Sequence, residues 1–381
     1  MKIFLFLKNN FMKIKKYFRI KFYREILNFK FRFSRDLRLL NLNNEVAISK
    51  KKSFMSINKL NEINELLAEK NKINKDSMWH SISNKFHLDF LNLVKNDIEK
   101  LEYALNNPHD FNIFYGFDDN CKILHNTPNF NFRFRYSKSI IDKLLSFCEY
   151  LGILRLDNPE YSKKKYNNLN IENLIRQIEK KISIKLSFIN PFPGEKGIKT
   201  SKGILSLREL EAIYQAYRIK KLIDVNNNIK NILEIGGGLG RTAYYCYRFG
   251  VKNYTLVDLL VPRICQINYL ARLISEKNII SNPKKINFNQ KNIKLISPEY
   301  LFSKNMKFDF VFNSDSFSEI DYFNQKRYIK YIVKNSKLFF SINHEYNKYK
   351  VTDFFKIKNV NNYSKNLYWL RKGYVEEIFI L

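Results

Sequence analysis

The sequence predicts an α/β fold with a mostly parallel sheet in residues 226–381, preceded by an α-rich region. Three observations lead to this prediction. After residue 230, short apolar runs alternate with helical segments, as in successive strand–helix–strand units. The first apolar run ends in a glycine-rich turn. Acidic residues end or follow several of the runs, at the edge where open parallel sheets bind their ligands.

Residues 1–55 form a basic N-terminal segment and linker. Residues 1–52 hold 15 Lys and Arg against 3 acidic residues, a net charge of +12 within a total of +31. Apolar residues spaced three or four apart predict a helix over residues 11–30 with Lys and Arg between them. Two interpretations remain open for it: binding to an anionic membrane surface, or packing of its apolar face on protein.

Residues 56–225 are predicted to be rich in helix and to lie on the acceptor side of the site. The helical pattern that starts at Leu60 ends near Asn107, where Pro108 follows. An irregular stretch at 111–136 and a loop with two prolines and two glycines at 190–197 interrupt the region. Further helices are predicted over residues 140–151, 172–184 and 206–224.

Residues 226–381 contain the predicted sheet. The β-type runs are residues 231–235, 254–257, 308–312, 337–342 and 374–381, and the helices between them are residues 242–249, 263–275 and 323–334. The last run is predicted to be an antiparallel edge strand.

The glycine-rich turn and two acidic residues predict a nucleotide-type ligand. Glu234 lies near the end of the first β-type run and Asp258 ends the second. Each acid alone fits an ordinary loop carboxylate, but the pair at two neighbouring strand ends favours a binding site. Glycines allow positive φ and a close approach of the backbone to a ligand. The glycines of the turn are Gly236, Gly237, Gly238 and Gly240.

Two further segments lie at the same predicted edge. The third run is followed by Asn313, Asp315, Ser316 and Glu319, which are candidates for contact with an acceptor. The alternative is that Ser316 or Ser318 caps the next helix, with Glu319 as the capping-box partner, and both interpretations can hold at once. His344 follows the fourth run directly. It is either structural or, with Asp315, a candidate base for deprotonating an acceptor hydroxyl.

These motifs resemble a family of sugar O-methyltransferases. The family shares an E-I-G-G-G-x-G turn, an Asp-Leu pair and an N-x-D-S-x-x-E segment, found here at residues 234–240, 258–259 and 313–319. The resemblance extends from about residue 75 to the last residue and includes residues 77–79, 158–160, 190–192 and 203–219.

The resemblance implies a Rossmann-like class I methyltransferase domain. The implied cofactor is S-adenosyl-L-methionine, held by Glu234, the glycine turn and Asp258, and the implied acceptor is a sugar or glycan in surface-polysaccharide biosynthesis. Tyr214 and Arg218, four residues apart on the preceding helix, are candidates for closing over the cofactor, with packing and a surface ion pair as the alternative. No metal is implied.

The remaining features bear on compartment and partner. Four widely spaced cysteines and the lack of a run of ~20 apolar residues favour a cytoplasmic protein, with peripheral contact at the inner membrane face through residues 11–30. The charge fits either a polyanionic partner or a general compositional bias towards Lys. The alternatives to a sugar enzyme are an RNA methyltransferase, for which no base-stacking motif is present, and a non-catalytic membrane-associated protein of the same fold.

Overall fold

The computed structural model describes residues 46–50, 53–69, 73–75, 77–125, 130–156, 170–226, 228–304, 306–358 and 360–381. The predicted basic helix over residues 11–30 and the motif at residues 158–160 lie outside this part of the chain.

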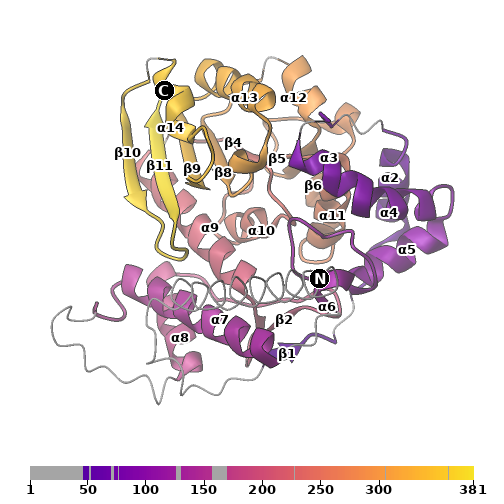
Figure 1. The fold of residues 1–381 in the computed structure, drawn as a ribbon, viewed down its shortest axis with the longest axis horizontal. Helices are drawn as coiled ribbons and strands as arrows, with labels where there is room; N and C mark the ends of the chain where they lie inside the picture. Colours follow the sequence, from indigo (N-terminus) through magenta and orange to yellow (C-terminus); the bar gives the residue numbers. More distant parts are fainter. Residues whose placement is uncertain are drawn as a thin grey trace, which may run out of the picture.

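The central element of the described chain is an eight-stranded sheet with the order β10-β11-β9-β8-β4-β5-β7-β6 (Figure 1). The strands from β9 to β6 along this order pair in parallel, whereas β11 is antiparallel to both β9 and β10. The bounds are β4 Ile232–Ile235, β5 Tyr254–Val257, β6 Ile279–Ile280, β7 Ile293–Ile296, β8 Phe310–Ser314, β9 Leu338–His344, β10 Tyr363–Leu367 and β11 Tyr374–Ile380. The chain leaves β4 towards β5 and later returns to β8 on its other side, which creates a switch point at the carboxyl end of β4.

Helices cover both faces of this sheet because neighbouring strand residues point to opposite sides. Phe310 and Phe312 belong to one buried cluster together with helices α9 to α11. Val311, between them, belongs to a second cluster together with α12 to α14. The bounds are α9 Leu207–Val225, α10 Arg241–Arg248, α11 Leu260–Ala271, α12 Pro298–Ser303, α13 Tyr322–Asn335 and α14 Val351–Lys356. The result is a three-layer α/β/α domain.

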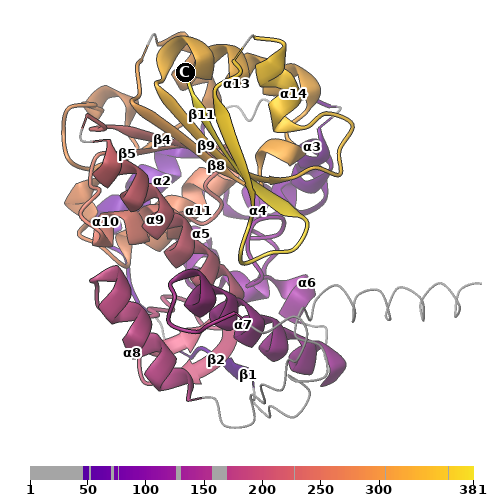
Figure 2. The same ribbon diagram turned by 90° about the vertical axis from the view of Figure 1, so that its left-hand side faces the viewer.

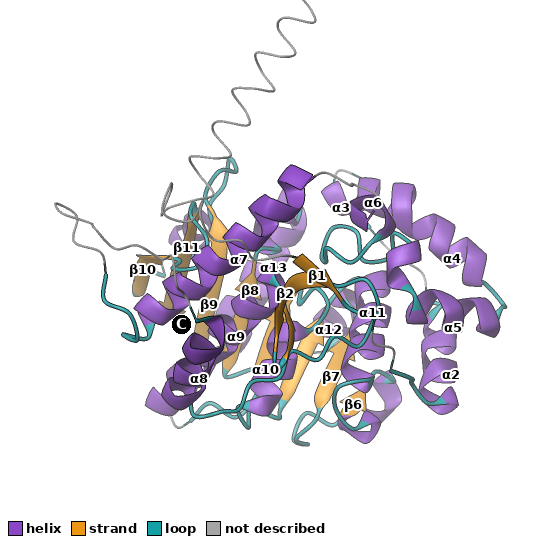
Figure 3. Cartoon of the chain, turned by 90° about the horizontal axis from the view of Figure 1, so that it is seen from below, coloured by secondary structure: helices purple, strands orange, loops and turns teal. Residues whose placement is uncertain are grey.

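The preceding residues add helices at the β6 end of the sheet and below it. Helices α2, α4 and α5 lie together beyond β6, at the opposite end of the molecule from β10 and β11 (Figure 3). Helices α7 and α8 lie below the large sheet next to a small sheet of order β1-β2-β3 (Figure 2). The bounds are α2 Ile57–Leu66, α3 Met78–Ile82, α4 Leu88–Val94, α5 Ile98–Asn106, α6 Lys122–His125, α7 Phe130–Tyr150, α8 Ile171–Ile182, β1 Val46–Ile48, β2 Lys196–Thr200 and β3 Gly203–Leu205.

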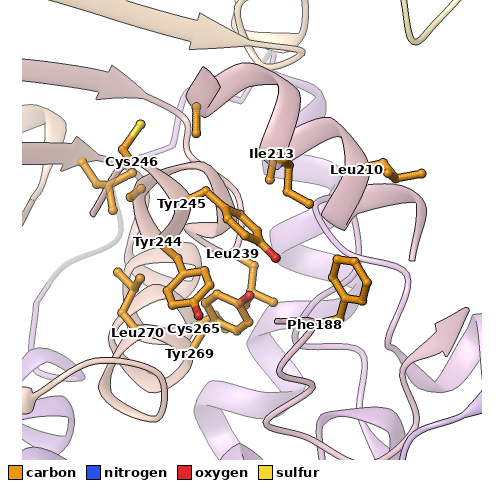
Figure 4. Packing of buried hydrophobic residues seen from close by; sticks show 14 of the residues in the cluster. Phe188, Leu210, Ile213, Leu239, Tyr244, Tyr245, Cys246, Cys265, Tyr269 and Leu270 are labelled. Carbon is orange, nitrogen blue, oxygen red and sulfur yellow. The ribbon is translucent and has the colours of Figure 1, made fainter. Parts of the chain in front are cut away.

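One hydrophobic cluster joins the helical region to the sheet, since it contains Leu60 of α2 and Phe340 of β9. Figure 4 shows part of this core, where Tyr244 and Tyr245 of α10 lie near Tyr269 of α11. The Tyr245 hydroxyl donates to Glu209 Oε1 of α9 at 2.7 Å. The packing of α9, α10 and α11 therefore fixes the start of α10, which directly follows the glycine turn.

The predicted α/β fold with a mostly parallel sheet is confirmed. The final strand β11 is antiparallel as predicted, but it lies inside the sheet, and the edge is β10, a polar strand that resembles a loop in sequence. The irregular stretch predicted up to residue 136 is wrong from Phe130 onward, where α7 begins. The predicted helical pattern from Leu60 is divided into short helices, of which α3 and α5 begin at the caps Ser77 and Asp97.

None of the helices in the described part of the chain combines the length and the apolar character that crossing a bilayer requires.

Candidate cofactor and acceptor site

A cavity of about 610 Å³ lies at the carboxyl ends of β4, β5 and β8. Glu234, the glycines at 236–238 and Asp258 line it on the side of β5. We call this the β5 side. The opposite part, the β8 side, is lined by residues from the loop after β8, from α9, from α3 and from the β10–β11 hairpin: Trp79, Arg208, Glu211, Asp315, Glu319, Tyr368, Arg371 and Tyr374.

The glycine turn has a backbone that side chains would not permit. Gly236 has φ +68°, and a Cβ added there would lie 2.2 Å from Ser316 Oγ. Gly238 has φ +56°, and the nearest atoms to an added Cβ are those of Phe117 at 3.7 Å, so this glycine leaves space in front of the turn. Gly237 also lines the cavity, whereas Gly240 caps α10 and lies outside the lining.

Glu234 is a buried carboxyl group at the bottom of the turn. Its Oε2 accepts a hydrogen bond from the Tyr254 hydroxyl at 3.1 Å. Burial, together with the charge of Asp258, raises its pKa to about 8. The carboxylate form therefore needs an additional donor or positive charge for its stabilisation.

Asp258 faces the cavity from the end of β5. Its oxygens accept hydrogen bonds from Gln266 Nε2 at 2.8 Å and from the Leu259 amide at 2.8 Å. Burial raises its pKa to about 7. Gln266 also donates to the Gly238 carbonyl at 3.0 Å, while its buried Oε1 has no partner within the described residues. Asp258 is thus held in a fixed orientation next to the turn.

The two carboxyl groups fit a ligand that carries an ammonium group and vicinal hydroxyls. Neither Glu234 nor Asp258 forms an ion pair within 4.0 Å in the described chain. An ammonium near Glu234 and two hydroxyls donating to Asp258 would supply the stabilisation that burial removes. The amino-acid and ribose parts of S-adenosyl-L-methionine carry these groups.

The loop after β8 is anchored to the glycine turn. Asn313 is buried outside the cavity lining and donates to the Ile235 carbonyl at 2.7 Å. Ser316 lines the cavity, and its Oγ donates to the same carbonyl at 3.0 Å. Of these two predicted acceptor contacts, Ser316 therefore reaches the cavity and Asn313 positions the loop.

Asp315 lines the β8 side, but each of its carboxylate oxygens already has a hydrogen-bond partner. Arg371 Nη1 lies 2.6 Å from its Oδ2, and the Tyr374 hydroxyl lies 2.5 Å from its Oδ1. Burial alone would raise the pKa of Asp315, but Arg371 and Tyr374 bring it below its usual value. Arg371 and Tyr374 come from the β10–β11 hairpin, and no local sequence motif indicates their role.

Glu319 lines the β8 side at the end of a short 3-10 turn, Phe317–Glu319. Burial, together with the charge of Asp315, raises its pKa to about 7. The predicted helix cap is wrong, because Asp321 caps α13 by accepting from the Asn324 amide at 3.1 Å. Glu319 therefore has no capping role.

Besides Gly240 and Asn313, three further predicted site residues lie outside the cavity lining. His344 accepts from the Tyr346 amide through Nδ1 at 3.3 Å, and its ring packs edge-on against Tyr374. Tyr214 and Arg218 both bond to the buried Glu376, at 2.5 Å and 3.1 Å. Tyr214 and Arg218 share one face of α9, as predicted, but this face is directed at β11. Arg218 therefore forms an internal ion pair with Glu376 instead of the expected contact with the cofactor.

Arg241, directly after the turn, joins the sheet to the helical region. It forms ion pairs of 2.9 to 3.0 Å with Asp118, Glu195 and Glu209. All four groups are buried. The three acidic partners come from different segments, so the start of α10 is fixed to the helical region that faces it.

No family model matches the chain, and no curated protein matches its sequence. Among solved structures it is similar to the methyltransferase domain of bacterial CtHen1, with a TM-score of 0.32 and 11% identity over 44% of this chain and 97% of that one. The similarity to the glycopeptide N-methyltransferase MtfA has a TM-score of 0.33 and 11% sequence identity, and it covers 43% of this chain and 94% of that one. The similarity to magnesium protoporphyrin IX methyltransferase from Synechocystis PCC 6803 has a TM-score of 0.31 and 11% sequence identity, and it covers 46% of this chain and 83% of that one.

The strand order of this chain itself defines a Rossmann-like α/β domain, in which the antiparallel strand β11 lies between β9 and β10. The names of the similar structures state the acceptors of those proteins, and these acceptors are not assigned to this chain. The resemblance to sugar O-methyltransferases stays a prediction.

Proposed function

We propose that the protein is an S-adenosylmethionine-dependent methyltransferase. The observation that carries the proposal is the placement of Glu234 and Asp258, at the ends of two neighbouring parallel strands, on either side of a glycine turn that lines one cavity. Glu234 would hold the amino-acid part of the cofactor and Asp258 its ribose hydroxyls. The cofactor supplies an electrophilic methyl group.

We propose a sugar hydroxyl as the acceptor. The β8 side combines carboxyl groups, arginines and aromatic rings: Glu319, Arg208, Arg371, Trp79 and Tyr368. A sugar hydroxyl both donates and accepts hydrogen bonds, so it can be held between a carboxylate and a guanidinium. Alignment of the acceptor oxygen with the methyl carbon supplies much of the rate acceleration in such a transfer.

Calorimetric titration with S-adenosylhomocysteine tests the cofactor part of the proposal. The full-length protein is expected to bind this product, and Asp258→Ala is expected to bind it more weakly. Binding that is equally tight in both proteins would argue against the assignment of the β5 side.

Transfer of labelled methyl groups into fractions of an extract of the source cells tests the acceptor. Label in the glycan or nucleotide-sugar fraction that survives RNase treatment, and that is absent with Asp258→Ala, is expected. An RNA acceptor is the second candidate, because the net charge of +31 favours a polyanionic partner. Label that disappears with RNase would favour that candidate.

We also propose that residues 11–30 hold the enzyme at an anionic membrane on the cytoplasmic side. The net charge of +12 in residues 1–52 supports this. Co-sedimentation with anionic vesicles is expected for the full chain and not for a variant without residues 1–45. Sedimentation together with an inability to bind S-adenosylhomocysteine would instead support the non-catalytic membrane-associated protein.

A further inference from the structure

Three of the carboxyl groups that line the cavity are already paired with a cation. Asp118 pairs with Arg241 at 3.0 Å, and Asp315 pairs with Arg371 at 2.6 Å. Glu211 pairs with Lys143, which holds the pKa of Glu211 below its usual value. A carboxylate in such a pair is a weak proton acceptor, because protonation would leave the cation without its partner.

Asp321 is occupied in a different way. Its carboxylate accepts hydrogen bonds from the Asn324 amide at 3.1 Å and from Asn324 Nδ2 at 2.7 Å, and it caps α13. Its Oδ1 also accepts from Asn74 Nδ2 at 3.1 Å. Protonation of this group would remove the cap from the helix.

Glu319 differs from these groups. It forms no ion pair within 4.0 Å in the described residues. Its neighbours are the Trp79 side chain and the charges of Asp315, Arg208 and Arg371, which come from the same loop, α9 and the β10–β11 hairpin. The loop that carries Glu319 touches the glycine turn through Ser316 and Gly236. Glu319 therefore combines access to the cavity with a carboxyl group that has no ion-pair partner within the described residues.

Arg208 is a suitable partner for the same acceptor. Its Nη1 lies 3.9 Å from both Asp315 Oδ2 and Glu211 Oε2, which is beyond hydrogen-bonding distance. Its N–H groups thus have room for a ligand oxygen. One acceptor hydroxyl placed between Arg208 and Glu319 accepts from the guanidinium and donates to the carboxylate.

We propose that Glu319 is the catalytic base that takes the proton of the acceptor hydroxyl, in place of His344 or Asp315. The inference rests on the proposed methyltransferase function. The acceptor oxygen forms a bond to the methyl carbon while the bond from that carbon to sulfur breaks, and the electron pair of the broken bond stays on sulfur. The hydroxyl proton passes to Glu319 and is released to water after the product leaves.

The decisive variant is Glu319→Gln, which keeps the size of the side chain and removes its ability to take a proton as a carboxylate. Labelled methyl transfer into the glycan fraction of source cells should fall by roughly 10²–10⁴-fold, the usual contribution of a general base. Glu319→Asp keeps a carboxylate and should lose less. The matched control is Glu345→Gln, which removes a carboxylate paired with Lys365 outside the cavity lining and should stay within about threefold of wild type. A Glu319→Gln rate within that range would overturn the proposal.

The pH profile separates a base from a structural residue. At a saturating concentration of S-adenosylmethionine, which removes the effect of Asp258 on cofactor binding from the profile, and a limiting concentration of the glycan fraction, the wild-type rate should rise with pH through about 7, because the base works only as a carboxylate. The Asp variant should keep such a rise, and the Gln variant should lose it. An unchanged rise in Glu319→Gln would overturn the proposal.

Two measurements do not depend on turnover. S-adenosylhomocysteine should bind wild type and Glu319→Gln with equal affinity, and infrared difference spectra of the two proteins should show one protonated carboxyl band that titrates near pH 7. A missing band, or a loss of binding in the Gln variant, would overturn the role of Glu319. Failure of wild type to bind would instead overturn the proposed function itself.

Discussion

Gly236 and Ser316 are in contact across the sheet: a Cβ on Gly236 would lie 2.2 Å from Ser316 Oγ. Ser316 in turn donates to the carbonyl of Ile235, the residue before the glycine. The cofactor turn and the loop that carries the acceptor-side residues are therefore one packed unit. A change in the turn is expected to move both.

Gly236→Ala is expected to destabilise the protein and to weaken S-adenosylhomocysteine binding. The positive φ of +68° alone costs about 1–2 kcal/mol for an L-residue, and the collision with Ser316 adds roughly 1–3 kcal/mol. Gly250→Ala is the matched control, since Gly250 has φ +84° and nothing within 4 Å of an added Cβ. Urea unfolding of both variants measures the difference, and equal losses would contradict the collision.

Asp258→Ala is expected to lower the affinity for S-adenosylhomocysteine by about 10- to 100-fold. Hydrogen bonds to a charged group contribute about 1.5–3 kcal/mol, and each 1.4 kcal/mol is tenfold in affinity. Asp224→Ala, which changes an exposed acid at the end of α9, should bind as wild type does. Isothermal titration calorimetry measures all three proteins.

Glu234→Gln is expected to stabilise the protein at pH 8 more than at pH 5. The folded-state pKa of Glu234 is raised to about 8 from 4.5 by burial. The folded protein therefore keeps a proton that the unfolded chain loses above pH ~4.5, so this group's stabilising contribution falls as pH rises through that window. The Gln variant lacks this dependence. Urea unfolding at both pH values tests it, and the same difference at pH 5 and pH 8 would refute it.

Arg218→Met is expected to destabilise the fold by roughly 3–5 kcal/mol, because it leaves the buried Glu376 without its cation. Tyr214→Phe removes one hydrogen bond to the same carboxylate and should cost about 1.5–3 kcal/mol. Both variants should keep wild-type affinity for S-adenosylhomocysteine at a temperature where they are folded. Weakened binding would restore the sequence-based expectation that Arg218 meets the cofactor.

The β5 side of the site could be predicted from sequence because its parts are local. Glu234, the glycines and Asp258 each lie within a few residues of a short apolar strand, and parallel strands bring such ends to one edge. The strands β6, β7 and β10 of this sheet were missed: β6 has only two residues, β7 carries Lys294 within its apolar run, and β10 is polar. They were identified only through their pairing with neighbouring strands.

The β8 side could be predicted only in part. Asp315 and Glu319 were found through their position after β8, but their roles depend on residues that are distant in sequence. Arg371 neutralises Asp315 from the hairpin, and Trp79 reaches Glu319 from α3. A sequence motif that follows one strand predicts which residue types lie near a site. The partners that set the charge of each carboxyl group appear only in the folded chain.

The position of Trp79 gives this protein an intrinsic optical probe. The chain has two tryptophans, Trp79 and Trp369. Trp79 lines the cavity beside Glu319, whereas Trp369 is 41% exposed and lies outside the lining. Ligand entry on the β8 side changes the surroundings of one indole and leaves the other in solvent. Emission of the unlabelled protein should therefore report occupancy of the acceptor side directly, which allows candidate sugars to be screened before any product is identified.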